Sequence, residues 1–260
     1  MITNTQGAQM KRVRELLAKS RARSEQGCYV VEGLRMCREI PAGDLEVIYA
    51  SESFLLRHGA EELPGVPETV SDSVMEKLSD TKSPQGVLAV VRQRRHEAEE
   101  LFAGPAASLF FLEHVQDPGN LGTMIRCAEG SGIDGLILSA GCADLYNPKV
   151  IRSTMGSVFR VPVAVVDDFP GTLLRAKACG VKLFAAHLRG EEDYDRIVYP
   201  AKTGVLIGNE ANGLSEEAAA LCDELVKIPM EGRVESLNAA VAATVFMYEI
   251  YRQKRNRLAL

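Results

Sequence analysis

Short apolar runs alternate with amphipathic segments through most of the chain. At its start, a charged helical pattern over residues 9–26 ends at Gly27, a residue type typical of helix termini. The apolar runs that follow predict three strands, and the segments between them predict helices. The predicted strands are 28–33, 45–53 and 86–93, and the predicted helices are 34–40 and 67–80. This alternation indicates a compact α/β module that ends near residue 93.

The segment 94–107 is charged at first and then rich in small residues, with Gly104 and Pro105 as breakers, which is typical of a linker. Beyond it, repeated βα units with apolar strands predict a mainly parallel sheet covered by helices. The predicted strands are 108–115, 134–140, 159–166, 181–188 and 203–208. We therefore expect an N-terminal α/β domain over 1–93, a linker over 94–107 and a second α/β domain over 108–260.

The net charge of −5 argues against a whole surface built for nucleic acid, so any such contact must use a local basic patch. The excess acidity lies in residues 98–260, which hold 21 acidic and 16 basic side chains. In contrast, residues 11–23 carry six positive charges against one negative charge. These six are candidates for phosphate contacts, with a solvated helix face as the alternative. They are Lys11, Arg12, Arg14, Lys19, Arg21 and Arg23.

The six cysteines are scattered and form no CxxC pair, which is typical of reduced thiols in a cytoplasmic protein. The four histidines show no metal-ligand spacing, so we expect no metal. The longest apolar stretch, over 237–251, is too short and too interrupted to span a membrane. It predicts a helix that is buried in the monomer or lies in a dimer interface.

A glycine-rich cluster, DPGNLGTMIRCAEGSG at residues 117–132, joins a predicted strand to a predicted helix. Dinucleotide-binding folds hold phosphate at such a junction, but these glycines do not fit the G-x-G-x-x-G spacing, and no G-K-[ST] of a P-loop occurs. What remains is Asn120 as the predicted N-cap and Arg126 further along the same helix. Taken alone, these two residues are a helix cap and an ion-pair partner.

Two further polar clusters follow predicted strands. The stretch VLIGNEANGLS, residues 205–215, places Gly208, Asn209 and Glu210 directly after an apolar run, where α/β folds bind ligands. The stretch IPMEGRVESLNAAVAATVFMYE, residues 228–249, is a tight loop followed by a long helix that Ser236 and Asn238 introduce. Taken alone, each cluster favours capping of loops and helices over a ligand site.

Together, the ordered set DPGNLGTMIRCA, IGNEANGLS and IPMEGRVESLNAAVA closely resembles the three motifs of the SpoU (TrmH) family of RNA 2′-O-ribose methyltransferases. The N-terminal module, with YVVEGLRMCREI, resembles the substrate-binding domain of the ribosomal-RNA members. The resemblance implies an RNA-binding domain over 1–93 and a SPOUT-type catalytic domain over 108–260, with a parallel sheet and a C-terminal trefoil knot. It also implies S-adenosylmethionine as cofactor and a homodimer with active sites near the subunit interface.

By this resemblance, five polar residues fall at the family's catalytic positions: Asn120, Arg126, Glu210, Ser236 and Asn238. Cofactor contacts are implied for Gly208, Ile228 and Leu237, and Asn209 and Met230 in the same loops complete the predicted set. Arg126 matches the family's proposed catalytic arginine. A guanidinium with a pKa above about 12 is a poor general base, so two roles stay open for it. It is either that base or a donor that orients the ribose hydroxyl and stabilises developing charge.

The predicted function is thus S-adenosylmethionine-dependent 2′-O-ribose methylation of RNA, with 23S ribosomal RNA as the favoured substrate because of the folded N-terminal module. A transfer-RNA 2′-O-ribose methyltransferase, with the same chemistry, is the nearest alternative. A non-catalytic RNA-binding ribosome-assembly factor is an alternative of another class, which the presence of Asn120, Arg126, Glu210 and Asn238 disfavours. The glycine spacing disfavours a nicotinamide-dependent oxidoreductase.

Overall fold

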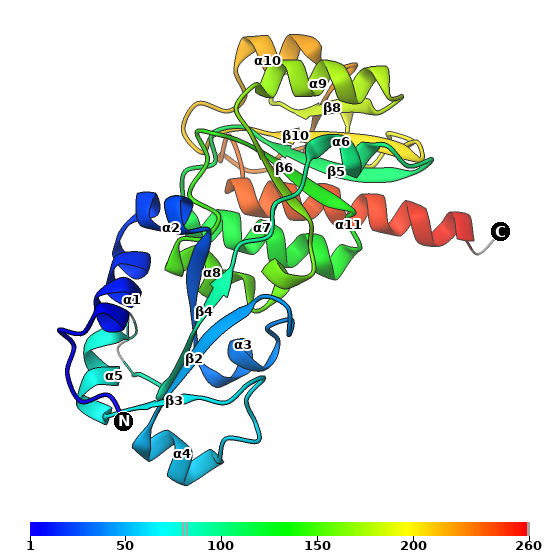
Figure 1. Ribbon diagram of the computed structural model, residues 1–260. Coiled ribbons are helices and arrows are strands. Elements are labelled where there is room, and N and C mark those ends of the chain that lie inside the picture. Colours follow the sequence, from blue (N-terminus) through cyan, green and yellow to red (C-terminus); the bar gives the residue numbers. More distant parts are fainter. Residues whose placement is uncertain (80, 82, 259–260) are drawn as a thin grey trace. The chain divides into compact units, whose positions relative to one another are not determined.

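The computed structural model describes residues 1–79, 81 and 83–258 (Figure 1). The chain forms two compact units. Unit 1 comprises Met1–Arg94 and Asp144–Phe159, and unit 2 comprises Arg95–Ala143 and the chain from Arg160 onward. Unit 2 carries the three sequence motifs.

A seven-stranded sheet in the order β7-β6-β5-β10-β8-β11-β9 forms the centre of unit 2, and every neighbouring pair is parallel. The strands are β5 (Ala107–Leu112), β6 (Gly135–Ser139), β7 (Val163–Val166), β8 (Lys182–Ala186), β9 (Glu192–Asp193), β10 (Lys202–Ile207) and β11 (Glu224–Lys227). All residues of β5 and β6 are buried, as expected for strands covered on both faces. The prediction of an α/β fold with a parallel sheet is confirmed.

Helices cover both faces of this sheet (Figure 1). One face carries α6 (Ala98–Phe102), α9 (Phe169–Ala178) and α10 (Glu216–Leu221), and the other carries α7 (Pro118–Ser131) and α11 (Ala239–Leu258). The short helix α6 lies inside the segment predicted to be a linker. Its Ala98 and Phe102 are buried in the core of unit 2, so this part of the chain is packed rather than a free connector.

Helix α7 shows how local sequence sets a boundary. Its N-cap is Asp117, whose carboxylate accepts a hydrogen bond from the amide of Asn120 at 2.8 Å. The prediction that Asn120 is the cap was wrong, because the helix begins earlier, at Pro118, and Asn120 lies inside its first turn. Proline suits this first position, where its missing N–H costs nothing. The helix ends at Gly132 in the left-handed conformation with φ of 65°. The helix therefore places the Asn120 side chain on its first turn, free for other contacts.

The longest helix of unit 2, α11, has 20 residues and ends in a strongly basic segment. Its Ala243, Phe246 and Met247 are buried, whereas Val241 and Tyr248 are about half exposed. No helix among the described residues is both long and apolar enough to cross a membrane.

Unit 1 is built on a four-stranded sheet in the order β1-β4-β2-β3, in which β4 is antiparallel to both neighbours and β2 is parallel to β3. The strands are β1 (Cys28–Glu32), β2 (Leu45–Ser51), β3 (Glu68–Val70) and β4 (Val87–Arg92). The helices formed from the N-terminal segment are α1 (Ala8–Ala18), α2 (Ser20–Gln26), α3 (Leu34–Arg38), α4 (Glu52–His58) and α5 (Asp72–Leu78).

Three details of unit 1 differ from the predicted elements. The single N-terminal helix is divided at Lys19, which has an extended conformation. The predicted strand 45–53 stops at Ser51, whose hydroxyl accepts from the amide of Phe54 and so begins α4, a helix that the pattern did not predict. The predicted helix over 67–80 begins with the short strand β3. In each case a change of backbone geometry falls inside a segment for which the pattern predicted a single element.

Alternation along the strands divides the core of unit 1 between two faces. Val31 and Ala89 pack with Met36 of α3, and their neighbours Val30 and Val90 pack with Met10 of α1 on the other face. Ile151 and Phe159 complete the first of these cores. They come from the segment Asp144–Phe159, which holds α8 (Pro148–Thr154) and the short 3₁₀ helix η1 (Ser157–Phe159). This segment lies within the predicted second domain but folds as part of unit 1.

An ion pair ties this segment to α2. The guanidinium of Arg23 donates to one carboxylate oxygen of Asp144 through Nε at 2.8 Å and through Nη2 at 2.5 Å. Its Nη1 donates to the carbonyl oxygens of Leu16 and Leu17, at 2.6 and 3.2 Å. Arg23 is only 3% exposed, so it cannot reach a phosphate. Its prediction as an RNA-binding residue was wrong, because the side chain closes the C-terminal end of α1 and anchors Asp144 instead.

Substitution Arg23→Ala is expected to lower the free energy of unfolding by about 3 kcal/mol, because it leaves the Asp144 carboxylate and two carbonyl groups without their buried partner. Chemical denaturation followed by circular dichroism measures the loss. The matched control is Arg21→Ala, since the Arg21 side chain is 87% exposed and its one ion pair with a described residue is with Glu25, one turn away. That change should cost less than about 0.5 kcal/mol. Equal effects of both substitutions would contradict a structural role for Arg23.

Candidate functional site

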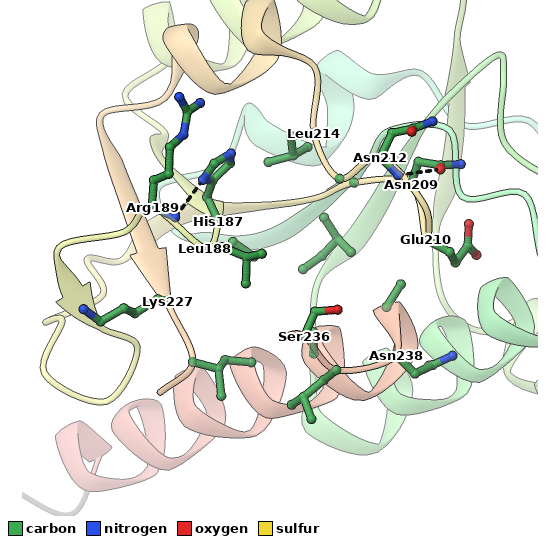
Figure 2. A pocket seen from close by; sticks show the side chains of 18 of the residues that line it. His187, Leu188, Arg189, Asn209, Glu210, Asn212, Leu214, Lys227, Ser236 and Asn238 are labelled. Atoms are coloured by element: carbon green, nitrogen blue, oxygen red, sulfur yellow. Dashed lines mark hydrogen bonds between the residues drawn. The ribbon is translucent and has the colours of Figure 1, made fainter. Parts of the chain in front are cut away.

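A cavity of about 710 Å³ opens at the carboxyl ends of β8, β10 and β11 in unit 2. These are three strands of one parallel sheet, so the loops that follow them converge at the same edge. The first turns of α11 form another wall (Figure 2). The lining residues of this helix include Ala239, Ala242 and Phe246. The cavity has the size of sites that enclose a small organic ligand.

All five predicted cofactor residues line this cavity: Gly208, Asn209, Ile228, Met230 and Leu237. Of the five predicted catalytic residues, Glu210, Ser236 and Asn238 line it as well. Figure 2 shows Ser236 beside the centre of the cavity and Glu210 and Asn238 at one end. The second and third sequence motifs thus meet at one site, although the twelve residues 216–227 separate them in the chain.

The loop after β10 is held in one conformation by its own backbone. Asn209 and Gly213 exchange two backbone hydrogen bonds of 2.9 Å, and the side-chain oxygen of Asn209 accepts from the amide of Ala211 at 2.9 Å. A Cβ atom on Gly208 would lie only 2.1 Å from the carbonyl carbon of Gly213. Gly208 is therefore required for the closure of this loop, which in turn presents backbone groups to the cavity.

Hydrogen bonds between side chains join all three motifs. The amide group of Asn238 donates to the side-chain oxygen of Asn120 at 3.0 Å, and the amide group of Asn120 donates to Glu210 at 2.9 Å. Asn238 also accepts from the amide of Ala240 at 2.9 Å and so begins α11, as predicted. Asn120 itself does not line the cavity, and its position is behind the polar end that Glu210 and Asn238 form.

Glu210 is the acceptor of this network. Besides Asn120, its carboxylate accepts from the backbone amides of Asp117 at 3.2 Å and Gln116 at 3.3 Å. Partial burial alone would raise the pKa of Glu210, but the hydrogen bonds from Asn120 and from backbone amides outweigh it and lower the pKa below the ordinary value of 4.5. The group is a fixed anion at neutral pH, suited to holding loops and not to accepting a proton.

Arg126 lies apart from this network. It is exposed on α7, about one and two-thirds turns beyond Asn120, and it does not line the cavity. Its guanidinium has no hydrogen bond or ion pair with another of the described residues. The structure therefore does not bring Arg126 together with the other four predicted catalytic residues within one chain. An unpaired, exposed guanidinium is available to an external anion.

Three basic residues at the opposite end of the cavity were not predicted. They are His187 and Arg189, which follow β8, and Lys227 at the end of β11 (Figure 2). The Nδ1 atom of His187 accepts from the amide of Arg189 at 3.0 Å, so the ring is held with its other nitrogen available as a donor. Burial and the charge of Arg189 lower the pKa of His187, with Glu216 opposing them. For His187 and Arg189 the signal in the sequence was their place at the end of the predicted strand 181–188, whereas Lys227 ends a strand that was not predicted.

The candidate phosphate contacts of unit 1 divide into three groups. Lys11, Arg14, Lys19 and Arg21 are exposed on α1, at its end and on α2. Arg12 pairs with Glu46 and donates to Gln26, so its charge is largely neutralised on the surface. Arg23 is buried, as described above.

The described residues were also compared with the arrangements of side chains that bind metal ions. Within residues 1–79, 81 and 83–258, no group of three His, Cys, Asp or Glu side chains is arranged to hold a metal ion.

Comparison with known proteins matches both parts of the chain to known families. Residues 107–248 match the SpoU rRNA Methylase family, and residues 7–89 match the MRM3-like substrate binding domain. The 23S rRNA (guanosine(2553)-2′-O)-methyltransferase RlmP of Bacillus subtilis is 36% identical over 181 residues, 70% of this chain and 71% of that protein. A 23S rRNA (uridine(2479)-2′-O)-methyltransferase of Streptomyces viridochromogenes is 37% identical over 192 residues, 70% of this chain and 66% of that protein.

Among solved structures, the AdoMet-bound rRNA methyltransferase of Sinorhizobium meliloti superposes with a TM-score of 0.85 at 29% identity. The match covers 96% of this chain and 97% of that one. Fold, cavity and motifs together define an RNA methyltransferase that uses S-adenosylmethionine (AdoMet). The chain belongs to the SpoU rRNA methylase family, and the resemblance seen in its three motifs is confirmed.

Substitution Glu210→Gln is expected to lower the free energy of unfolding by about 1 kcal/mol at pH 7, because a neutral amide replaces a charged acceptor of three hydrogen bonds. The folded-state pKa is depressed, so the contribution is fully present above pH 4.5 and is lost as the pH falls through the folded-state pKa. The difference between the two proteins should therefore shrink below pH 4.5. Urea denaturation across pH 3–7 measures it.

The matched control is Glu235→Gln, an exposed glutamate in the third motif. It should leave stability within about 0.5 kcal/mol at every pH. A stability difference for Glu210→Gln that persists unchanged at pH 3 would show that the charge is not what holds the loops.

Proposed function

We propose that this protein transfers a methyl group from S-adenosylmethionine to a ribose 2′-hydroxyl of 23S ribosomal RNA. The observation that carries the proposal is the cavity at the sheet edge, where all five residues expected to contact the cofactor meet the anionic end formed by Glu210. The two 23S enzymes to which the chain is similar modify different nucleotides, a guanosine and a uridine, so the target base is left open.

The residues of the cavity fit S-adenosylmethionine. Ile207, Val226, Ile228 and Phe246 give the middle of the cavity apolar walls suited to an adenine ring. The basic end with His187 and Lys227 suits the carboxylate of the methionine part. When bound, the cofactor supplies an electrophilic methyl group on a sulfonium.

The chain's own task is to present and orient the ribose hydroxyl and to keep the three motif loops in place. The chain of contacts from Asn238 through Asn120 to Glu210 holds the loops, and it leaves Ser236 facing the cavity as a hydrogen-bonding group. Arg126, exposed and unpaired among the described residues, binds the phosphate next to the reacting ribose and stabilises the developing oxyanion. We favour this role over that of a general base, because guanidinium holds its proton at neutral pH.

Two features of the family belong to the same proposal. One is a C-terminal trefoil knot, which would form where the segment 228–238 passes the loop after β10. The other is a homodimer in which α7 and α11 face the second subunit. In support of the dimer, Val241 and Tyr248 lie two turns apart on α11 and are 49% and 47% exposed. In such a dimer, Arg126 of one subunit serves the cavity of the partner, which accounts for its distance from the cavity of its own chain.

The proposed location is the bacterial cytoplasm, where ribosomal RNA is made. The six cysteines are all free thiols in the structure, in keeping with a reducing compartment.

Replacement of Arg126 by alanine should reduce methyl transfer at least about 100-fold while the affinity for S-adenosylmethionine stays within twofold, since the residue does not line the cavity of its own chain and its proposed contact is with RNA. Arg126→Lys should recover part of the activity, because it restores the positive charge. The assay measures label from S-adenosylmethionine in unmodified 23S ribosomal RNA and, separately, in transfer RNA, and maps the product for 2′-O-methylribose.

The matched control is Arg255→Ala, an exposed arginine on α11 that should retain full activity. Label found in transfer RNA alone would show that transfer RNA, and not ribosomal RNA, is the substrate. Absence of label in both RNAs, despite cofactor binding, would contradict the enzymatic proposal. Sedimentation of the same samples tests the dimer, since a monomer of 28.3 kDa at assay concentrations would contradict it.

Neutralising Lys11, Arg14, Lys19 and Arg21 together should weaken RNA binding and flatten its dependence on salt, because each lost phosphate contact removes released counterions. Filter binding of 23S ribosomal RNA between 50 and 300 mM salt measures both quantities. Affinity for S-adenosylmethionine, which binds in unit 2, should not change. A parallel loss of cofactor affinity would contradict the division of labour between the two units.

A further inference from the structure

His114 has an unusual backbone conformation at the edge of the sheet that carries the site. It lies two residues beyond the end of β5 and three before Asp117, the N-cap of α7. Its φ is +53°, in the left-handed region, and only one other non-glycine residue in the described chain has positive φ. A β-carbon is unfavourable in this region, so surrounding contacts must hold the residue there.

Two hydrogen bonds supply this restraint. The amide of His114 donates to the hydroxyl oxygen of Ser139 at 3.0 Å, at the end of the neighbouring strand β6. Its carbonyl oxygen accepts from the side-chain amide of Asn209 at 2.8 Å. Asn209 lines the cavity, so the backbone of His114 is bonded directly to the loop expected to contact the cofactor. The position of the residue is thus set from both strands that flank β5 in the sheet, by the last residue of β6 and by the loop after β10.

The imidazole ring is placed with equal precision. It lies against the backbone of Gly141, where an added Cβ atom would be 2.0 Å from Nδ1 and 2.5 Å from Cε1. Any other residue at 141 would displace the ring. His114 is nevertheless exposed, and among the described residues no hydrogen bond or ion pair to its imidazole is found. One side of the ring is supported by the chain and the remainder faces solvent.

We infer that the imidazole of His114 is a stacking platform for a nucleobase of the RNA substrate, next to the nucleotide that is methylated. Proteins recognise unpaired RNA by stacking its bases on exposed aromatic rings, which need a rigid support to act in this way. The strained backbone, the two hydrogen bonds and the glycine behind the ring give His114 that rigidity without burying it. The inference rests on the proposed function, since it adds a contact for the RNA substrate to the same site.

The test compares four variants. His114→Ala removes the ring, and His114→Phe keeps a flat aromatic surface without the imidazole nitrogens. Gly141→Ala keeps the imidazole ring but displaces it, because the added methyl group occupies its place and the His114 side chain can rotate away. His96→Ala, a partly exposed histidine at the start of unit 2, is the matched control. For each, kcat/KM with transcribed, unmodified 23S ribosomal RNA, RNA affinity by filter binding and cofactor affinity by calorimetry are measured.

We expect His114→Ala and Gly141→Ala to lower kcat/KM for RNA by roughly 5- to 150-fold, the usual range for loss of one stacked base. His114→Phe should stay within about threefold of the wild type, and none of the variants should change cofactor affinity. In the double variant the two effects should not add, because both remove the same contact.

Three results would overturn the inference. The first is full activity of His114→Ala. The second is inactivity of His114→Phe equal to that of His114→Ala, which would indicate chemistry of the imidazole nitrogens. The third is a parallel loss of cofactor affinity, which would make His114 only a support for Asn209. If the wild type binds the transcript but methylates no RNA, the proposed function fails, and the RNA affinities of the alanine and phenylalanine variants still decide whether the ring stacks. No binding of RNA by the wild type would overturn both.

Discussion

The hydrogen bonds accepted by the carboxylate of Glu210 hold together the loops that form the site. This carboxylate accepts hydrogen bonds from the side chain of Asn120 and from two backbone amides at the start of α7, and Asn120 in turn accepts from Asn238. Three loops that are far apart in the sequence are thereby joined through one anion. An anion is well suited to this task, because charged acceptors make stronger hydrogen bonds and Glu210 stays ionised at neutral pH. The apolar walls of the cavity can then be formed by loops that have no packed core of their own.

Much of unit 2 could be predicted from the sequence. Buried strands of a parallel sheet are continuous apolar runs, so β5, β6, β8 and β10 were located with small errors at their ends. The carboxyl ends of such strands share one edge, which made Gly208 and Asn209 candidates for the cavity, whereas Ile228 was predicted from the family resemblance. The family assignment, which rested on three motifs in order, was confirmed.

The errors have physical causes. Asn120 was predicted as a cap because its residue type suits one, but Asp117 lies just before a proline and serves better, which frees Asn120 for Glu210. Arg23 was grouped with exposed basic residues by sequence proximity, whereas a helix turns one residue of such a group inward. His187 and Lys227 gave no motif, because their role depends on which strands are neighbours in the sheet. The pattern of apolar and polar residues does not determine which strands are neighbours in a sheet.

The segment Asp144–Phe159 bears on how such proteins can be taken apart and recombined. Unit 1 is completed by residues that follow the first motif of unit 2, so the chain passes between the units three times and neither unit is a continuous stretch. A fragment that ended at residue 93 would lack Ile151 and Phe159 from its core and Asp144 from its ion pair. An exchange of substrate-binding domains between related enzymes by a single crossover would therefore separate residues that fold together. To be transferred intact, such a domain must include the segment Asp144–Phe159, which lies in the sequence between two parts of unit 2.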